Sequence, residues 1–221
     1  MYFAIHTPDT ARAKDFYNAV FGWTYDSSGD YHHIKGSSPA GGITPGDTAR
    51  IGVSFPVPDA AAAVAKVREL GGTAPDPVRS ESGWSVQIED GHGGGAELWQ
   101  PAEGYAGDSD PQEGDVFYFV QPVANDDAKS FYTSVLGWEL TPGSHPGGWN
   151  ITNVTPPGGL FVSTAGNTDL YFQVADVDAA KELIRQAGGT AGETRPNTHG
   201  HHAACADDQG TAFSIGSVSQ A

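Results

Sequence analysis

The chain has 221 residues, 38% of them hydrophobic, and a formal charge of −16. This acidity disfavours a phosphate backbone, so no nucleic acid partner is expected, and the single cysteine, Cys205, excludes an internal disulfide framework. No apolar run reaches membrane-spanning length and the first residues lack the regions of a signal peptide, so we expect a cytoplasmic protein without a membrane partner.

The first half opens with an alternating segment, Tyr2–His6, which predicts a strand with Phe3 and Ile5 on one face. Apolar residues in Ala13–Phe21 recur at the spacing of a helix that is buried on one side, and Gly22 follows as its C-cap. Short strands are predicted next, near residues 31–35 and 42–44.

A second unit follows in the same half. Ile51, Val53 and Phe55 share one face of a predicted strand. The alanine-rich segment Ala60–Leu70 is a predicted helix that ends at a pair of glycines. Two closing strands are expected at Trp84–Glu89 and Ala96–Gln100.

The second half repeats the first. AKDFYNAVFGW (Ala13–Trp23) returns as AKSFYTSVLGW (Ala128–Trp138), and the helix ending Gly-Gly-Thr occurs at both 71–73 and 188–190. The acidic, turn-rich residues 101–114 are the predicted linker between domains 1–100 and 115–221. The order β-α-β-β-β is therefore expected four times, near residues 2–48, 51–100, 115–164 and 168–218.

Four such units predict an α+β fold with curved mixed sheets and helices on the outside. The sheet face opposite the helices should line a concavity. Counting along the strands places aromatic and polar side chains on that face, and these are the candidate ligand-binding residues: Tyr2, Ser54, Trp99, Phe117, Phe119, Gln121, Asp169, Tyr171, Gln173 and Phe213.

The strand followed by D-x-x-x-A-x-x-FY-x-x-V-x-GW, together with paired βαβββ units, resembles the vicinal oxygen chelate superfamily. This group includes glyoxalases, bleomycin-resistance proteins and extradiol dioxygenases. The duplication resembles tandem two-domain glyoxalase-like proteins. The resemblance covers nearly the whole chain and implies a fold, whereas the motif alone does not identify an activity.

Members of this superfamily that use a metal hold it through His, Glu or Gln on the first and last strands. The resemblance places those positions at Tyr2, Gly52 and Glu97 in the first half, and at Phe117, Asp169 and Phe213 in the second. Phenylalanine and glycine offer no donor, so the usual triad is not expected. His6 could substitute beside Glu97, which would make this pair catalytic or a weak metal site; otherwise His6 is a polar residue that lines a pocket.

The segment THGHHAAC holds a histidine cluster. In a strand, His199 and His201 would share a face and could bind a metal with Asp169, or could bond to a ligand at the rim. His202 would face away.

We therefore expect a protein that binds a small aromatic or partly apolar molecule, of the sequestration or resistance type, without the usual metal triad. The alternative is a glyoxalase-like lyase or isomerase, or a dioxygenase, that uses a divalent metal or His/Glu acid–base chemistry. No cofactor is expected in the first case and a divalent metal in the second. The partner would be a small-molecule ligand or substrate, with the protein a monomer or a homodimer.

Overall fold

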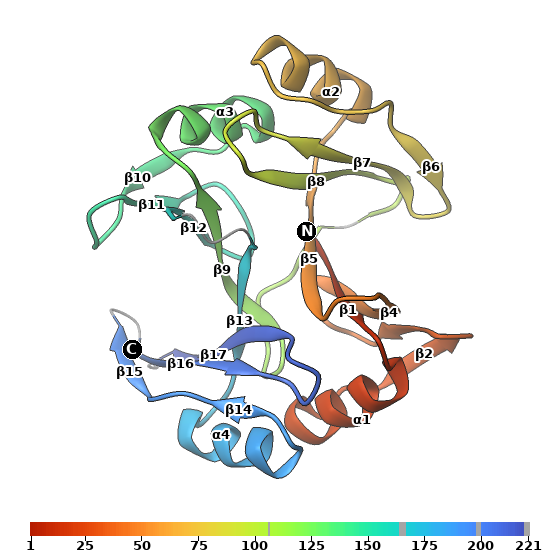
Figure 1. Ribbon diagram of the computed structural model, residues 1–221, viewed down its shortest axis with the longest axis vertical. Coiled ribbons are helices and arrows are strands. Elements are labelled where there is room, and N and C mark those ends of the chain that lie inside the picture. Colours follow the sequence, from red (N-terminus) through yellow and green to blue (C-terminus); the bar gives the residue numbers. More distant parts are fainter. Residues whose placement is uncertain (106, 164–166, 198–199, 219–221) are drawn as a thin grey trace. The chain divides into compact units, whose positions relative to one another are not determined.

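The computed structural model describes residues 1–105, 107–163, 167–197 and 200–218 (Figure 1). The first half holds two βαβββ modules, as the sequence predicts. The first module consists of β1 (Tyr2–Thr7), α1 (Thr10–Phe21), β2 (Tyr25–Ser28), β3 (Tyr31–Ile34) and β4 (Ala40–Pro45). The second consists of β5 (Arg50–Pro56), α2 (Ala60–Glu69), β6 (Val78–Ser80), β7 (Gly83–Glu89) and β8 (Gly95–Pro101).

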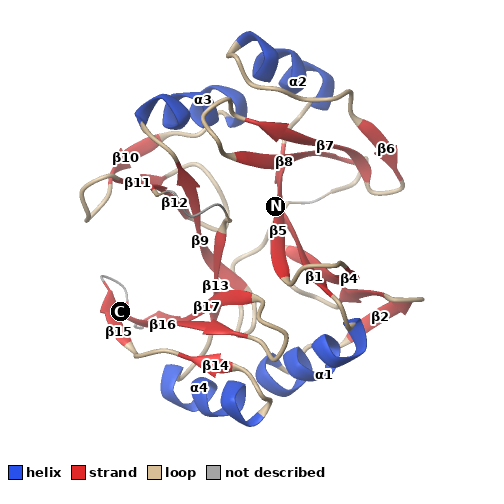
Figure 2. Ribbon diagram, viewed as in Figure 1, coloured by secondary structure: helices blue, strands red, loops and turns tan. Residues whose placement is uncertain are grey.

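The second half repeats this order, with one additional short strand, β15 (Figure 2). Its first module consists of β9 (Val116–Val123), α3 (Asp126–Leu136), β10 (Leu140–Pro142), β11 (Gly148–Ile151) and β12 (Gly158–Val162). Its second consists of β13 (Asp169–Gln173), α4 (Val177–Gln186), β14 (Thr190–Ala191), β15 (Arg195–Asn197), β16 (Gly200–Ala206) and β17 (Ala212–Val218).

The strands form two mixed sheets, which together with the four helices give the α+β fold. The eight-stranded sheet has the order β2-β3-β4-β1-β5-β8-β7-β6. The nine-stranded sheet has the order β10-β11-β12-β9-β13-β17-β16-β14, with β15 paired to β16. β5 runs parallel to β8 and β13 parallel to β17, whereas β7 and β16 pair antiparallel with these closing strands.

Each helix begins at an acidic or amide side chain that caps it. Asp9, Asp59, Asn125 and Asp176 all have extended backbones and accept hydrogen bonds from N–H groups of the first turn. These bonds satisfy donors that have no partner inside the helix. α1 and α3 both end at a glycine in the left-handed conformation, as the two Gly-Trp motifs predict.

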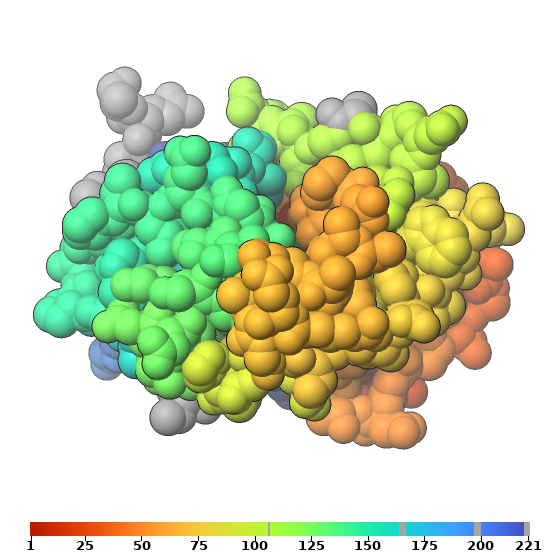
Figure 3. Space-filling view, turned by 90° about the horizontal axis from the view of Figure 1, so that it is seen from above, coloured from red at the N-terminus to blue at the C-terminus, as the bar shows by residue number. Residues whose placement is uncertain are grey.

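By compactness the described chain divides into two units, and each contains one module from each half. Unit 1 comprises residues 1–2, 53–108 and 120–168, and unit 2 comprises residues 3–52, 109–119 and 169–221. α2 contacts α3 within unit 1, where their residues adjoin on the surface (Figure 3), and α1 contacts α4 within unit 2. That residues 101–114 link two domains, 1–100 and 115–221, remains a prediction from the sequence repeat.

The two repeated motifs meet inside each unit. A Cβ atom on Gly189 would lie 2.9 Å from Cε2 of Phe16, and a Cβ on Gly72 would lie 2.9 Å from Cε2 of Phe131. The phenylalanine of each FY pair therefore packs on the Gly-Gly-Thr helix end that comes from the other half of the chain. This close approach leaves no room for a side chain at Gly72 or Gly189.

Aromatic rings fill the core of unit 2. Phe16 and Tyr17 of α1 lie 6.4 Å and 5.9 Å from the ring centroid of Phe213, and Phe172 lies 5.6 Å from that of Phe3. All five side chains are buried. No helix in the described part of the chain is both long enough and apolar enough to cross a bilayer.

Candidate functional site

The sheet face that points away from the helices, called here the open face, carries a fixed carboxylate in unit 1. Glu97 of β8 lies in register between Ser54 of β5 and Gln87 of β7. Ser54 Oγ donates to Glu97 Oε1 over 2.6 Å, and Gln87 Nε2 donates to Oε2. Both carboxylate oxygens are therefore held by protein donors, and the orientation of Glu97 is set before any ligand binds.

Aromatic rings lie further along the open face of unit 1. The ring centroid of Trp99 lies 6.2 Å from that of Tyr2 and 5.0 Å from that of Tyr105. Trp99 Nε1 donates to the carbonyl oxygen of Ser82 over 3.0 Å. The structure thus brings predicted residues together in two pairs, Ser54 with Glu97 and Tyr2 with Trp99. His6 belongs to unit 2, so its predicted pairing with Glu97 stays a prediction.

The open face of unit 2 carries a second polar group, which is built around Tyr171. Tyr171 of β13 is in register with Ser214 of β17, and Ser214 Oγ donates to Asp169 Oδ2 over 3.1 Å. Burial raises the pKa of Asp169, while hydrogen bonds from Ser214 and Tyr171 act in the opposite direction. Burial and the nearby Asp169 raise the pKa of Tyr171, so its hydroxyl stays a donor at neutral pH.

Three further rings surround Tyr171. The ring centroids of Phe117, Tyr118 and His202 lie 6.4, 5.8 and 6.0 Å from that of Tyr171. Phe117 extends over Gly216, because a Cβ there would lie 2.7 Å from Phe117 Cζ. These four rings are half-buried. With Asp169 and Ser214, these rings form what we call the Tyr171 cluster: Phe117, Tyr118, Asp169, Tyr171, His202 and Ser214.

His202 was missed as a site residue, because the sequence predicts His201 on the inner face instead. The register pairs His202 with Gly216 and His201 with Ser217, and it is His202 that contacts Tyr171. Burial, together with the nearby Arg195, lowers the pKa of His202. His201 is exposed. His199 lies outside the described residues.

Two residues predicted on the open face of β9 are buried instead. Phe119 and Gln121 are each 2% exposed. Gln121 Oε1 accepts a hydrogen bond of 2.6 Å from the Thr168 hydroxyl, so its amide is satisfied inside unit 1. Tyr118, the neighbour of Phe119 on the strand, lies beside Tyr171. The prediction that Phe119 and Gln121 lie on the open face is therefore wrong.

Phe213 is also placed differently from the prediction. It lies in the aromatic core beside Phe16 and Tyr17, and its neighbour Ser214 occupies the position that corresponds to Glu97. The second half therefore has a hydroxyl where the first has a carboxylate. Gln173 is half-buried and its backbone bonds to Gly114 and Asp115, so a ligand contact of its side chain stays a prediction.

The donor set does not fit the metal centre that the resemblance implies. Position 52 is glycine and so offers no metal ligand, and a Cβ built there would lie 3.2 Å from Nε2 of the His6 imidazole. Ser214, a weak ligand for a divalent ion, stands in place of the second carboxylate. Among the described residues no group of three or more His, Cys, Asp or Glu side chains could hold a metal ion.

A family model described as a glyoxalase-like domain matches residues 2–113. The sequence has no significant match among curated proteins.

Solved structures share the fold at low sequence identity. The 2,3-dioxygenase LapB from Pseudomonas sp. KL28 is 16% identical with a TM-score of 0.71, covering 99% of this chain and 91% of that one. The Mn(II)-bound glyoxalase from Novosphingobium aromaticivorans is 17% identical with a TM-score of 0.73, covering 98% and 80%. Homoprotocatechuate 2,3-dioxygenase from Brevibacterium fuscum is 16% identical with a TM-score of 0.71, covering 99% and 79%.

Proposed function

Because this chain belongs to the family of glyoxalase-like domains and has the vicinal oxygen chelate fold, we propose that it binds a small aromatic or partly apolar molecule at the Tyr171 cluster. The observation that carries the proposal is the set of rings around Tyr171, beside a carboxylate that Ser214 holds. The protein would retain its ligand, in the manner of a sequestering protein.

The chemistry of the cluster suits a flat ligand with few polar groups. Half-buried rings at centroid distances of 5.8 to 6.4 Å from Tyr171 offer faces and edges to an aromatic molecule. Asp169 adds a hydrogen-bond acceptor, and His202 adds a ring that can donate or accept a hydrogen bond. A few polar groups among apolar walls fix the orientation of a ligand, whereas the walls supply most of its affinity.

We expect Tyr171→Ala to weaken the binding of N-phenyl-1-naphthylamine, a neutral fluorescent aromatic probe, by about tenfold, because loss of one well-packed ring removes on the order of 1–2 kcal/mol. Fluorescence titration measures this. Tyr31→Ala is the matched control, since Tyr31 is an exposed tyrosine of unit 2 that lies outside the cluster.

An equal affinity of the Tyr171→Ala and Tyr31→Ala proteins would reject the Tyr171 cluster as the site. So would a wild-type protein that gives no saturable signal with the probe.

A second candidate function is that of a lyase or isomerase of the glyoxalase type, or of a dioxygenase. The position of Glu97 favours it, because a carboxylate that Ser54 and Gln87 hold in a fixed orientation is suited to move a proton. The solved structures with this fold include 2,3-dioxygenases and a Mn(II)-bound glyoxalase. Catalysis would then depend on Glu97 as a base or a metal ligand.

Metal content distinguishes ligand binding without a metal from the metal-dependent form of the enzyme. After incubation with Mn²⁺, Fe²⁺ or Zn²⁺ and removal of free metal, we expect less than about 0.2 equivalents to remain per chain, because one or two protein ligands are too few for tight binding. Elemental analysis by plasma mass spectrometry measures this. One equivalent that disappears in Glu97→Ala would instead support the enzyme.

A further inference from the structure

The His6 side chain lies between two glycines on the open face of unit 2. A Cβ on Gly46 would lie 2.9 Å from His6 Cβ, and one on Gly52 would lie 3.2 Å from His6 Nε2. A side chain at position 46 would clash with His6 Cβ, and one at position 52 would crowd the imidazole. The two glycines thus form a slot that fits this side chain.

Gly52 is needed for space and not for its backbone conformation. Gly52 is described, and it is not one of the glycines with positive φ, so other residues could adopt its backbone angles. The same Cβ would lie 3.1 Å from Arg50 Nη1. The guanidinium of Arg50 and the imidazole of His6 therefore converge on the single point that Gly52 leaves open.

Among the described residues Arg50 has no ion-pair partner, although the protein is strongly acidic. The chain has 11 Lys and Arg residues against 27 Asp and Glu, and Arg12, Arg68 and Arg185 all form ion pairs. Within the residues that the structure describes, neither an ion pair nor a side-chain hydrogen bond holds the guanidinium of Arg50. A permanent cation that is free and beside an imidazole disfavours a divalent metal ion and favours an anion.

We propose that His6 and Arg50 form an anion-binding site over Gly52 that takes the carboxylate of a small organic molecule. A guanidinium presents planar N–H donors that match the two oxygens of a carboxylate, and His6 Nε2 can carry a third donor. The strand position that offers a metal ligand in related folds thus serves here to recognise an oxyanion.

This site is independent of the proposed function. It uses β1 and β5, whereas the Tyr171 cluster uses β9, β13, β16 and β17. Failure of one site in its own assay therefore leaves the other untouched, because neither Arg50 nor His6 belongs to the Tyr171 cluster.

Benzoate, benzamide and inorganic phosphate are the probes. Benzamide has the shape of benzoate without its charge, and phosphate is an oxyanion without a planar carboxylate. In ¹H–¹⁵N spectra of the arginine Nε groups of the full chain, we expect benzoate to shift the Arg50 signal, which is assigned by its loss in Arg50→Gln. Calorimetry should show that benzoate binds about tenfold more tightly than benzamide, as expected for a charge-assisted pair.

Variants decide between the site and a general charge effect. Arg50→Gln, His6→Ala and Gly52→Ala should each remove most of the preference for benzoate, whereas Arg79→Gln, which removes the same charge from an exposed residue of unit 1, should keep it. Thermal melting checks that each variant is folded. Equal binding of benzoate and benzamide, an unshifted Arg50 signal, tighter binding of phosphate, or a preference that survives in Arg50→Gln would overturn the proposal.

Discussion

Replacing Phe16 with alanine is expected to lower the free energy of unfolding by about 3–5 kcal/mol. Phe16 is 3% exposed, and its ring lies 5.1 Å from that of Tyr17 and 6.4 Å from that of Phe213. Its edge also lies against Gly189. No side chain at that glycine can move to fill the cavity, so the full loss of packing should be measured in a urea titration.

The exposed Phe161 provides the control. Its side chain is 41% exposed on β12, so Phe161→Ala should change the free energy of unfolding by less than about 0.5 kcal/mol. Phe131→Ala should resemble Phe16→Ala, because Phe131 makes the equivalent contact with Gly72. A loss below about 1 kcal/mol for Phe16→Ala would show that the helix stripe is not part of the core.

The features that the sequence predicted correctly are local or repeated. The spacing of Phe16, Tyr17 and Val20 predicts the buried stripe of α1, and all three are buried. The C-cap at Gly22 follows from the chemistry of helix ends and is confirmed. Because the second half repeats the motif, the same buried stripe and helix end are predicted there without further evidence.

Alternation along β9 predicts Phe119 and Gln121 on the open face, and the structure buries both side chains instead. Asp9 caps α1 seven residues before Phe16, whereas Asn125 caps α3 six residues before Phe131. The second half therefore lacks one residue between the cap and the motif. Because side chains alternate along a strand, a shift of one residue exchanges the faces of the residues near the cap, and Phe119 and Gln121 are buried accordingly. Phe117, at the start of β9, keeps its predicted place beside Tyr171. The different spacing of Asp9 and Asn125 in the sequence could have revealed this shift.

The remaining features of the site depend on which strands pair, and periodicity does not specify this. His202 faces Tyr171 because β16 pairs with β17 in a register that sets His202 opposite Gly216. The slot at His6 depends in the same way on Gly46 and Gly52, which both lie far from His6 in the sequence. The grouping of modules from different halves into one compact unit likewise rests on contacts that no local pattern encodes.

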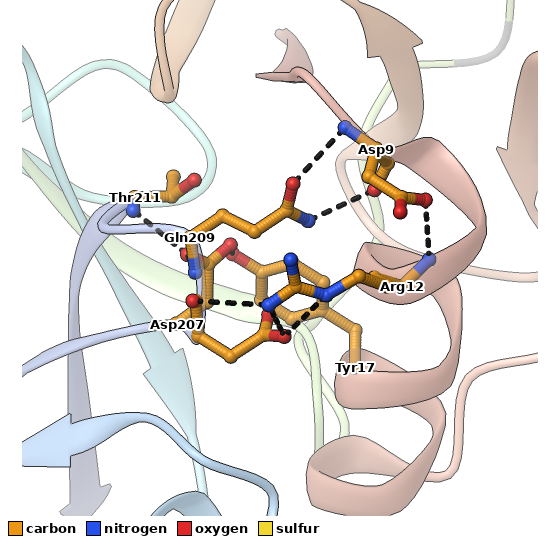
Figure 4. Close-up of polar contacts among 7 residues, drawn as sticks. Asp9, Arg12, Tyr17, Asp207, Gln209 and Thr211 are labelled. Atoms are coloured by element: carbon orange, nitrogen blue, oxygen red, sulfur yellow. Dashed lines mark hydrogen bonds and ion pairs between the residues drawn. The ribbon is translucent and has the colours of Figure 1, made fainter.

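The second large effect is expected at Asp207, a buried carboxylate in the turn between β16 and β17 (Figure 4). Its Oδ1 accepts hydrogen bonds from the backbone N–H groups of Gln209 and Thr211 over 2.9 and 2.8 Å. Its Oδ2 accepts the Tyr17 hydroxyl over 3.1 Å. Burial raises the pKa of Tyr17, and Asp207 raises it further, so this hydroxyl stays protonated and donates.

Asp207→Ala should therefore lower the free energy of unfolding by about 3–5 kcal/mol, because two donors inside the protein, Tyr17 and the Thr211 amide, lose their acceptor and cannot reach water.

The adjacent Asp208 is the matched control. It pairs with Arg12, which is 56% exposed, so Asp208→Ala should cost less than about 1 kcal/mol. Tyr17→Phe removes one of the three bonds and should fall between the two. Equal stabilities of Asp207→Ala and Asp208→Ala in urea titrations would show that the turn is not held by Asp207.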